Sequence, residues 1–332
     1  MKTKDELWYL LFATFAYFFM IKMMKGLFIY LIVTVLLSCN SGTNNLSSGL
    51  SDDMDMSLPF TIEQEAVKPL YTYKNEELQN ALEQIINKQP RWKSLVAEKK
   101  MAVGLVVLND TSNIKFARVN GDDIMYAASL PKIAILLAME DALDKGEIKE
   151  TSAIHDDMRK MIARSDNEAA TRLIDLLGFE KIEKVLTDPE YLLYDEEHGG
   201  GLWVGKRYAK TGKRYPEPIK GISHAATVNQ VCRFYYLLVN GQLVSPERSA
   251  QMLDIMQDPE LHHKFVNSIE KVAPKAKLFR KSGTWHDYHA DSILVWGPKR
   301  KYILVALTEA SDGEKILRDL ALKVDNTLIA PN

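Results

Sequence analysis

At residues 129–138 the chain reads Ser129-Leu130-Pro131-Lys132-Ile133-Ala134-Ile135-Leu136-Leu137-Ala138. The apolar run after Lys132 predicts a helix over residues 130–143, and a proline fits its first turn because the missing N–H has no intrahelical partner there. Ser129 then stands at a helix N-terminus, where free N–H groups and the helix dipole favour an alkoxide. Lys132 projects from the same face one turn later, as a potential proton acceptor. The alternative is that Ser129 only caps the helix and Lys132 is a solvated side chain.

The elements on either side of this helix predict an α+β fold. Strands are expected near both ends of the chain and helices between them, so one antiparallel sheet is favoured, because parallel pairing would need crossover helices. Residues 188–224 show no clear periodicity and predict a long irregular excursion. The expected helices cover residues 76–86, 130–143, 154–163, 167–177, 180–186, 228–239, 246–256 and 313–322, and the expected strands cover residues 101–108, 114–119, 278–285, 290–296 and 302–307.

The composition is that of a folded protein. With 332 residues and 46% hydrophobic side chains, the chain can bury a sizeable core. The formal net charge of −2 provides no long-range attraction to a polyanion, so we expect no nucleic-acid partner. Cys39 and Cys232 lie in such different sequence surroundings that we expect no disulfide between them.

The N-terminus has the pattern of an export signal. Residues 7–37 are almost wholly apolar, and the second half of this stretch has a basic start and an apolar run shorter than the roughly 20 residues that span a bilayer. It ends at Leu36-Leu37-Ser38-Cys39, which resembles a bacterial lipobox. The alternative is a membrane hairpin, or one long anchor, that also uses residues 7–21; initiation at Met23 or Met24 would shorten the signal.

We therefore expect three regions along the chain. Residues 1–38 form the export segment, and residues 39–58, rich in Ser, Asn, Gly and Asp, form a flexible tether. Residues 59–332 form the folded domain. The protein is then exported and held by a lipid on Cys39 at a bacterial membrane, in the periplasm or on the cell surface.

Two further short motifs lie at the boundaries of predicted elements. Ser165-Asp166-Asn167 ends one helix and opens the next, although Ser, Asp and Asn are also ordinary N-cap residues. Lys281-Ser282-Gly283-Thr284 lies within a predicted strand, where a glycine lets another backbone or a ligand approach closely. A similar Lys210-Thr211-Gly212 lies in the aperiodic stretch and carries no weight.

The ordered combination of the three motifs decides the interpretation. Ser-x-x-Lys at a helix start, Ser-Asp-Asn on a loop and Lys-Ser-Gly on a late strand follow one another along the chain. On these residues the sequence resembles class A β-lactamases and the related penicillin-binding proteins, over roughly residues 60–325. The resemblance implies a serine β-lactamase/DD-peptidase-like fold, with an antiparallel sheet formed from both chain ends, flanking helices, and a helical lobe beside it.

The resemblance also implies a catalytic set. Ser129 would attack the carbonyl carbon of a β-lactam or a D-alanyl peptide and form a covalent acyl-enzyme. Lys132 would help to deprotonate Ser129. For the family it is disputed whether this base is the lysine or a glutamate that acts through a water molecule. Ser165 would relay a proton towards the departing nitrogen.

Four further residues are implied in substrate binding. Asn167 would bind the substrate's side-chain amide and Lys132, while Lys281 and Ser282 would bind its carboxylate. The backbone N–H groups of Ser129 and Thr284 would form the oxyanion hole. We expect no metal, no cofactor and a monomer.

Two departures from the family pattern leave the reaction open. The segment between Ser129 and Ser165 is short, so a helical segment and its rim loop are expected to be missing. The Glu-x-x-Leu-Asn pattern that carries the water-activating glutamate is absent, and Glu190, Glu196 and Glu197 are only in the right neighbourhood. A β-lactamase is therefore the leading hypothesis. A D-alanyl-D-alanine carboxypeptidase, or another penicillin-binding protein or serine acyl hydrolase with slow deacylation, is the second, and a non-catalytic ligand-binding lipoprotein is the third.

Other polar and aromatic clusters predict ordinary structure. The polar residues that follow the Lys-Ser-Gly motif are expected to line a turn, and His262 and His263 are expected at the surface. The loop aromatics are expected to pack against the domain more often than to line a cleft. The polar cluster comprises His286, Asp287, His289 and Asp291, and the loop aromatics are Trp203, Tyr208 and Tyr215.

Overall fold

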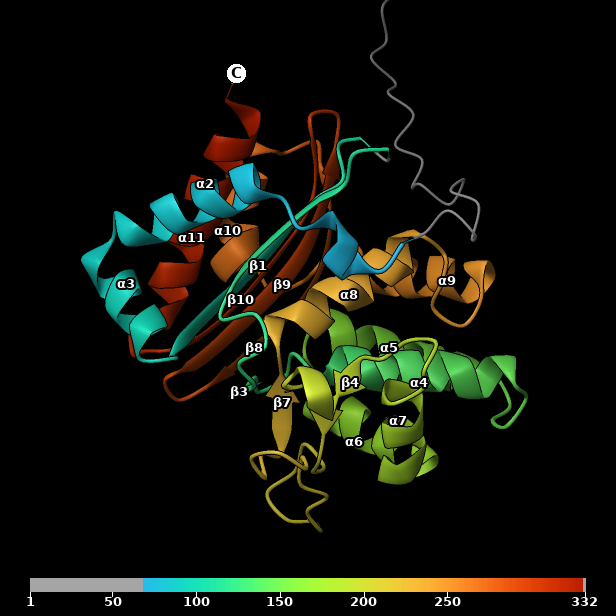
Figure 1. The fold of residues 1–332 in the computed structure, drawn as a ribbon. Coiled ribbons are helices and arrows are strands. Elements are labelled where there is room, and N and C mark those ends of the chain that lie inside the picture. Colours follow the sequence, from blue (N-terminus) through green and yellow to red (C-terminus); the bar gives the residue numbers. More distant parts are fainter. Residues whose placement is uncertain (1–67, 111, 331–332) are drawn as a thin grey trace, which may run out of the picture. The chain divides into compact units, whose positions relative to one another are not determined.

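The computed structural model describes residues 68–110 and 112–330, all of which belong to one unit that covers residues 54–332. The predicted export segment, Cys39 and the tether lie outside the described residues. Strands from both ends of this region form a five-stranded antiparallel sheet in the order β2-β1-β10-β9-β8, as predicted (Figure 1). Its strands are β1 (Met101–Val107), β2 (Lys115–Val119), β8 (Lys277–Trp285), β9 (Tyr288–Gly297) and β10 (Arg300–Glu309).

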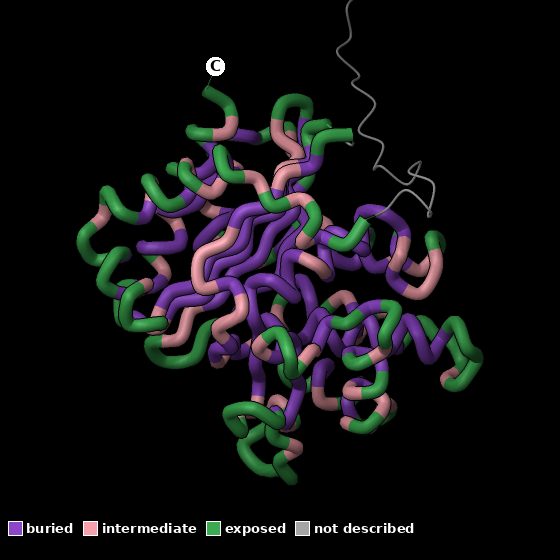
Figure 2. The backbone as a smooth tube through the Cα atoms, in the orientation of Figure 1, coloured by how far each residue is buried: buried purple, intermediate pink, exposed green. Residues whose placement is uncertain are grey.

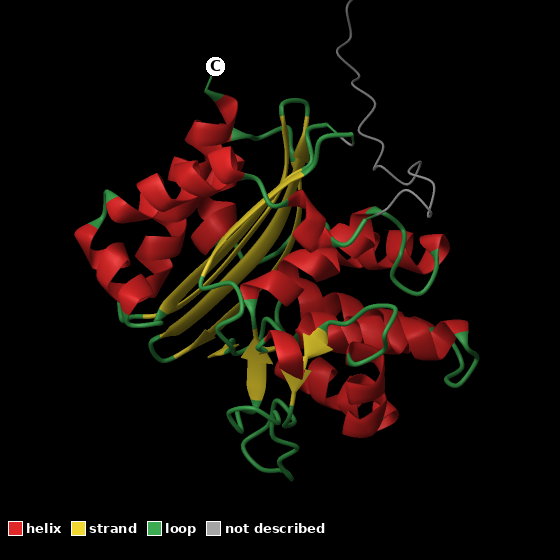
Figure 3. Cartoon of the chain, viewed as in Figure 1, coloured by secondary structure: helices red, strands yellow, loops and turns green. Residues whose placement is uncertain are grey.

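Helices cover both faces of this sheet, as Figure 3 shows. Because side chains alternate between the two faces of a strand, β1 contributes Val103 to one hydrophobic core and Ala102 to the other. Both faces of the central strands are therefore buried (Figure 2). Four helices cover the first face: α2 (Glu76–Asn87), α3 (Pro90–Ala97), α10 (Lys264–Val272) and α11 (Gly313–Ile329).

The second face contacts α8 (Val228–Val239), beyond which lies the helical lobe. In this lobe α4 (Lys132–Asp144) is buried at every position from Lys132 to Leu143, as expected for a central helix in which most residues are apolar on every side. The other helices are α5 (Ser152–Ala163), α6 (Asn167–Leu177), α7 (Phe179–Leu186) and α9 (Pro246–Met256). Three of these four, α5, α6 and α9, have a side-chain N-cap; Asp166, for example, accepts a hydrogen bond from Ala169 N at 2.7 Å.

The structure adds elements that the sequence patterns did not predict. Helices α3 and α10 occur in segments for which no helix was predicted. The expected single sheet is accompanied by a three-stranded sheet, β3-β7-β6, and a two-stranded one, β4-β5. Strands this short are too brief to display alternation. The additional elements are β3 (Met125–Tyr126), β4 (Tyr194–Asp195), β5 (Gly200–Gly201), β6 (Trp203–Val204), β7 (His224–Ala226), and the 3₁₀ turns η2 (Leu70–Tyr73) and η3 (Glu196–His198).

Within residues 68–110 and 112–330, none of the helices combines the length and the apolar character needed to cross a bilayer.

Candidate active site

Ser129 lies in a tight turn just before α4. Ala128 adopts a left-handed conformation with φ of 50°, and Lys132 N donates to Ser129 O at 3.3 Å. The regular helix begins at Lys132, and Pro131 is its N-cap. Ser129 therefore lies before the helix, three residues ahead of its first residue, and not in its first turn. Left-handed backbone at a non-glycine residue is strained and tends to occur at functional sites.

Lys132 joins the first motif to the second. Its side chain is fully buried, and Nζ donates to Ser165 O at 2.6 Å, to Asn167 Oδ1 at 2.8 Å and to Asp166 O at 3.2 Å. Burial lowers the pKa of the Lys132 amine to about 7, against the opposing charge of Asp166. The amine therefore exists in both protonation states near neutral pH, as a general base requires.

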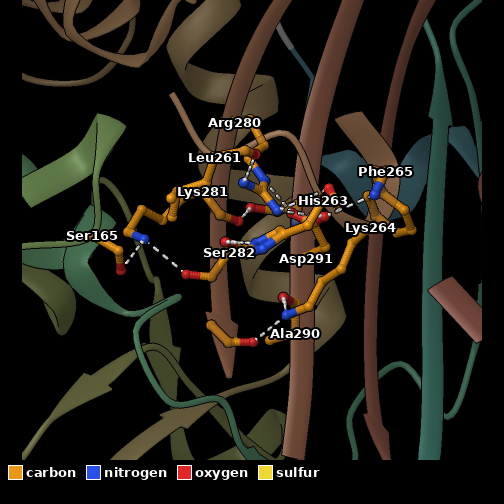
Figure 4. Close-up of polar contacts among 12 residues, drawn as sticks. Ser165, Leu261, His263, Lys264, Phe265, Arg280, Lys281, Ser282, Ala290 and Asp291 are labelled. Atoms are coloured by element: carbon orange, nitrogen blue, oxygen red, sulfur yellow. Dashed lines mark hydrogen bonds and ion pairs between the residues drawn. The ribbon is translucent and has the colours of Figure 1, made fainter. Parts of the chain in front are cut away.

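Lys281 joins the third motif to the second. Its Nζ donates to Ser165 Oγ at 2.9 Å and to Ser282 O at 2.7 Å, and Figure 4 shows it extending from β8 to Ser165. Burial lowers the pKa of Lys281 well below its ordinary value, and the positive charges of Lys132 and Arg280 lower it further. The three motifs thus meet in one hydrogen-bonded cluster.

Gly283 lets the edge strand β8 approach the Ser129 turn. A Cβ at this position would lie 2.2 Å from Ala127 O, 2.7 Å from Ser129 N and 2.9 Å from Leu130 N. Since these are backbone atoms, they can give way only if the whole turn shifts. The glycine therefore places the backbone of Ser129 beside that of Gly283 and Thr284.

A cavity of about 1030 Å³ opens at this point. Ser129, Asn167 and Thr284 line it, while Lys132 and Lys281 are buried beside it. Aromatic and basic residues form much of its remaining wall. The aromatic residues are Tyr126, Tyr208, Trp285 and Tyr288, and the loop that follows β6 adds Lys206, Lys210, Arg214 and Lys220.

Tyr208 is one of the loop aromatics for which packing against the domain was the favoured prediction, but it lines the cavity. Lys132 Nζ lies 4.4 Å from the centroid of its ring, and its hydroxyl donates to Ala128 O at 3.2 Å. Burial raises the pKa of the Tyr208 hydroxyl well above its ordinary value. The other two loop aromatics behave as expected: Trp203 and Tyr215 stack on each other, with centroids 5.8 Å apart, and do not line the cavity.

The prediction for His263 was wrong, because this residue is half-buried and its Nε2 lies 3.2 Å from Ser282 Oγ. Burial lowers the pKa of His263 to about 4, with help from the charge of Arg280. Asp291 is also not a turn residue, since it is fully buried and forms a bidentate pair with Arg280 at 2.7 and 3.0 Å. His262 is exposed, as predicted.

Comparison with known proteins now decides the family. Residues 150–328, more than half of the chain, match the sequence model of the Beta-lactamase enzyme family. The chain belongs to that family. It is an enzyme of the serine hydrolase type. No curated protein matches it in sequence.

Solved structures support the same fold for this β-lactamase-family enzyme. A β-lactamase from Sphaerobacter thermophilus is 18% identical, with a TM-score of 0.59, over 76% of this chain and 99% of that one. The protein PBP-A is 20% identical, with a TM-score of 0.57, over 76% of this chain and 96% of that one. An ancestral class A β-lactamase is 16% identical, with a TM-score of 0.57, over 73% and 99%. The predicted fold class is confirmed.

The acidic residues considered for water activation do not reach the site of this family member. Glu190, Glu196 and Glu197 are all exposed, and none lines the cavity. Glu309 is the acidic residue among those that line it. In the described part of the chain, no carboxylate oxygen lies within 4.0 Å of Lys132 Nζ. Tyr208 lies against this amine instead.

Proposed function

We propose that this enzyme transfers acyl groups from β-lactams or D-alanyl peptides to Ser129, and that it hydrolyses the resulting acyl-enzyme slowly. The observation that carries the proposal is the cluster in which Lys132 and Lys281 both bind the Ser165 loop beside the cavity that Ser129 lines.

The proposed reaction assigns one step to each group. Lys132, in its neutral form, accepts the proton of Ser129 Oγ as this oxygen attacks the carbonyl carbon. The N–H groups of Ser129 and Thr284 bind the oxyanion that develops. As the C–N bond breaks, Ser165 passes a proton to the departing nitrogen and receives one from Lys281, with which it is hydrogen-bonded at 2.9 Å. An ester on Ser129 is left.

Slow hydrolysis of this ester is supported by the surroundings of Lys132. A water molecule needs a base to attack the ester, and the contacts of Lys132 Nζ are the two carbonyl oxygens, the Asn167 amide oxygen and the ring of Tyr208. A variant of PBP-A has been solved as an acyl-enzyme complex with penicillin G. We infer that the present enzyme resembles a penicillin-binding protein more than an efficient β-lactamase.

A fluorescent penicillin tests the nucleophile. We expect covalent labelling of the wild type, loss of labelling in Ser129→Ala, and normal labelling in the control Ser94→Ala, which changes an exposed serine on α3. An unlabelled wild type, or a labelled Ser129→Ala, would refute the proposal. The protein's mass after a short exposure to penicillin, followed over time, then reports hydrolysis: a persistent adduct supports slow deacylation, and rapid return to the free mass supports a β-lactamase.

Export, a lipid on Cys39 and a monomeric state remain proposals. Cys39 lies outside the described residues, and the motif Leu36-Leu37-Ser38-Cys39 is what supports export and the lipid. An enzyme that acts on cell-wall peptides would find its substrate outside the cytoplasmic membrane, so this location suits the proposed reaction.

A further inference from the structure

A second lysine is buried against the strand that carries the Lys-Ser-Gly motif, on the face opposite the helical lobe. Lys264, the first residue of α10, is fully buried, and its Nζ donates to Gly283 O at 2.5 Å, to Thr284 Oγ1 at 2.8 Å and to Ala290 O at 3.1 Å (Figure 4). Burying an ammonium group costs free energy unless its hydrogen bonds are satisfied, and here three oxygens satisfy it.

The contact with Lys264 shows which way the Gly283–Thr284 peptide is oriented. Gly283 and Ala290 are paired residues of β8 and β9, and their carbonyl oxygens share Lys264, so the Gly283 carbonyl points into the sheet. In a trans peptide the N–H of the next residue points the opposite way. The N–H of Thr284 therefore faces the open edge of β8, where Ser129 N also lies close to Gly283.

Among the described residues, the ammonium group of Lys264 forms no ion pair with a carboxylate. Asp291, which is fully buried, forms its ion pair with Arg280, and within residues 68–110 and 112–330 no carboxylate lies within 4.0 Å of Lys264 Nζ. A hydrogen bond from a cation to a carbonyl draws electron density from that peptide and makes its N–H a stronger donor, most of all in a buried site.

The backbone of Lys264 is strained in a way that serves this contact. The residue adopts a left-handed conformation with φ of 51°, which a non-glycine residue rarely does. Asp291 Oδ2 accepts from Phe265 N at 3.0 Å, and Arg280 donates to the carbonyl oxygens of Leu261 and His263. The same ion pair thus fixes the segment that aims Lys264 at β8.

We propose that Lys264 is a positioning residue that polarises the Gly283–Thr284 peptide, so that the N–H of Thr284 stabilises the oxyanion of acylation more strongly. The inference rests on the proposed acylation of Ser129. If Lys264 had a purely structural role and only attached α10 to the sheet, its replacement in a folded protein would leave the rate at saturating substrate unchanged.

The first test compares Lys264→Met with the wild type and with Lys271→Met, which changes an exposed lysine on the same helix. For Lys264→Met we expect the acylation rate constant at saturating penicillin to fall about tenfold. This is less than the loss expected when an oxyanion-hole donor is removed altogether, because the Thr284 N–H is only weakened. The affinity of the initial complex should change little. Lys271→Met keeps the wild-type rate. An unchanged rate constant in a folded Lys264→Met protein would overturn the inference.

A spectroscopic test reads the polarisation directly. The ester carbonyl of the acyl-enzyme, made with penicillin labelled with ¹³C at the β-lactam carbonyl, should stretch at a higher infrared frequency in Lys264→Met, because its hydrogen bond is weaker. An unshifted band would leave Lys264 with a structural role only. A wild type that forms no ester at all would refute the proposed function instead, so the two failures are distinguishable.

Lys264→Arg keeps the test decisive if Lys264→Met does not fold. Burial lowers the pKa of Lys264 to about 8, so the wild-type acylation rate should decline above that pH as the ammonium loses its proton, whereas an arginine stays charged. The same alkaline decline in Lys264→Arg would contradict the inference. Other charged or titratable groups surround Lys264, and all are unchanged in this variant: His263, Arg280, Lys281, His289, Asp291 and Glu314.

Discussion

Lys132 determines how the enzyme should respond to pH. Because burial lowers the pKa of its amine to about 7, the fraction in the neutral, proton-accepting form rises as the pH rises through 7. We therefore expect the acylation rate constant to increase from about pH 6, to reach a maximum between about pH 7 and pH 8, and to decline above that as Lys264, with a pKa of about 8, loses its proton. Stopped-flow labelling with a fluorescent penicillin measures this, and Lys132→Arg should lower the rate by on the order of a thousandfold at every pH.

Stability gives an independent check on the same amine. An unfolded lysine holds its proton up to about pH 10.4, so between pH 7 and pH 9 the unfolded state binds more protons than the folded state. The free energy of unfolding should therefore rise with pH in this window. Urea titrations should show a shallower rise for Lys132→Met, in which Lys264 and Lys281 still contribute. An equally steep rise in that variant would mean that the Lys132 amine stays protonated in the fold.

Strand β8 depends on one residue for its approach to the nucleophile. In Gly283→Ala the added methyl would lie 2.2 Å from Ala127 O, so the strand or the Ser129 turn must move. A displacement of this kind should slow acylation by on the order of a hundredfold. It should also lower the free energy of unfolding by about 1–3 kcal/mol.

Gly146→Ala is the control for stability alone. Its methyl meets no atom within 4 Å, but its φ of 66° strains an alanine, so the variant should lose stability and keep the wild-type labelling rate. Labelling rates and urea midpoints of both variants, measured together, decide the point. A Gly283→Ala protein that is labelled at the wild-type rate would show that β8 does not limit the site.

Charge is distributed unevenly over the described part of the molecule. The whole chain has a formal net charge of −2, yet the loop beside the cavity presents basic side chains that have no carboxylate partner within 4.0 Å among the described residues. An anionic β-lactam should be attracted to this rim, so the second-order acylation rate constant should fall severalfold as the ionic strength rises from about 0.02 to 0.5 M. These rim residues are Lys206, Lys210, Arg214 and Lys220.

Replacing the four rim residues by glutamine should remove both the rate advantage at low salt and the dependence on salt. Four exposed lysines outside the cavity, replaced in the same way, serve as the control for net charge and should leave the salt dependence intact. A wild-type rate that does not change with ionic strength would contradict the prediction. The control positions are Lys88, Lys93, Lys275 and Lys299.

Long regular elements and the ordered motifs were determined by local sequence. Helices α6, α8 and α9 and the five-stranded sheet follow from apolar periodicity, because each presents a continuous face to a core. The order of Ser-x-x-Lys, Ser-Asp-Asn and Lys-Ser-Gly was enough to identify the family. Helix α10 also has apolar residues at helical spacing, Phe265, Val266 and Ile269, but it lacks the usual signals of a helix start: it begins at a left-handed lysine and has no side-chain cap.

Only the tertiary structure decided what surrounds the reactive groups. Tyr208 lies over Lys132 because an aperiodic loop folds back across the cavity, and Lys264 reaches β8 because helix α10 crosses the face of the sheet opposite the helical lobe. The lowered pKa values of Lys132, Lys264 and Lys281 likewise depend on burial by residues far away in sequence. Local pattern reports which residues can form a helix, a strand or a motif. Desolvation and contact distance depend on how those elements pack, and no short stretch of sequence contains that information.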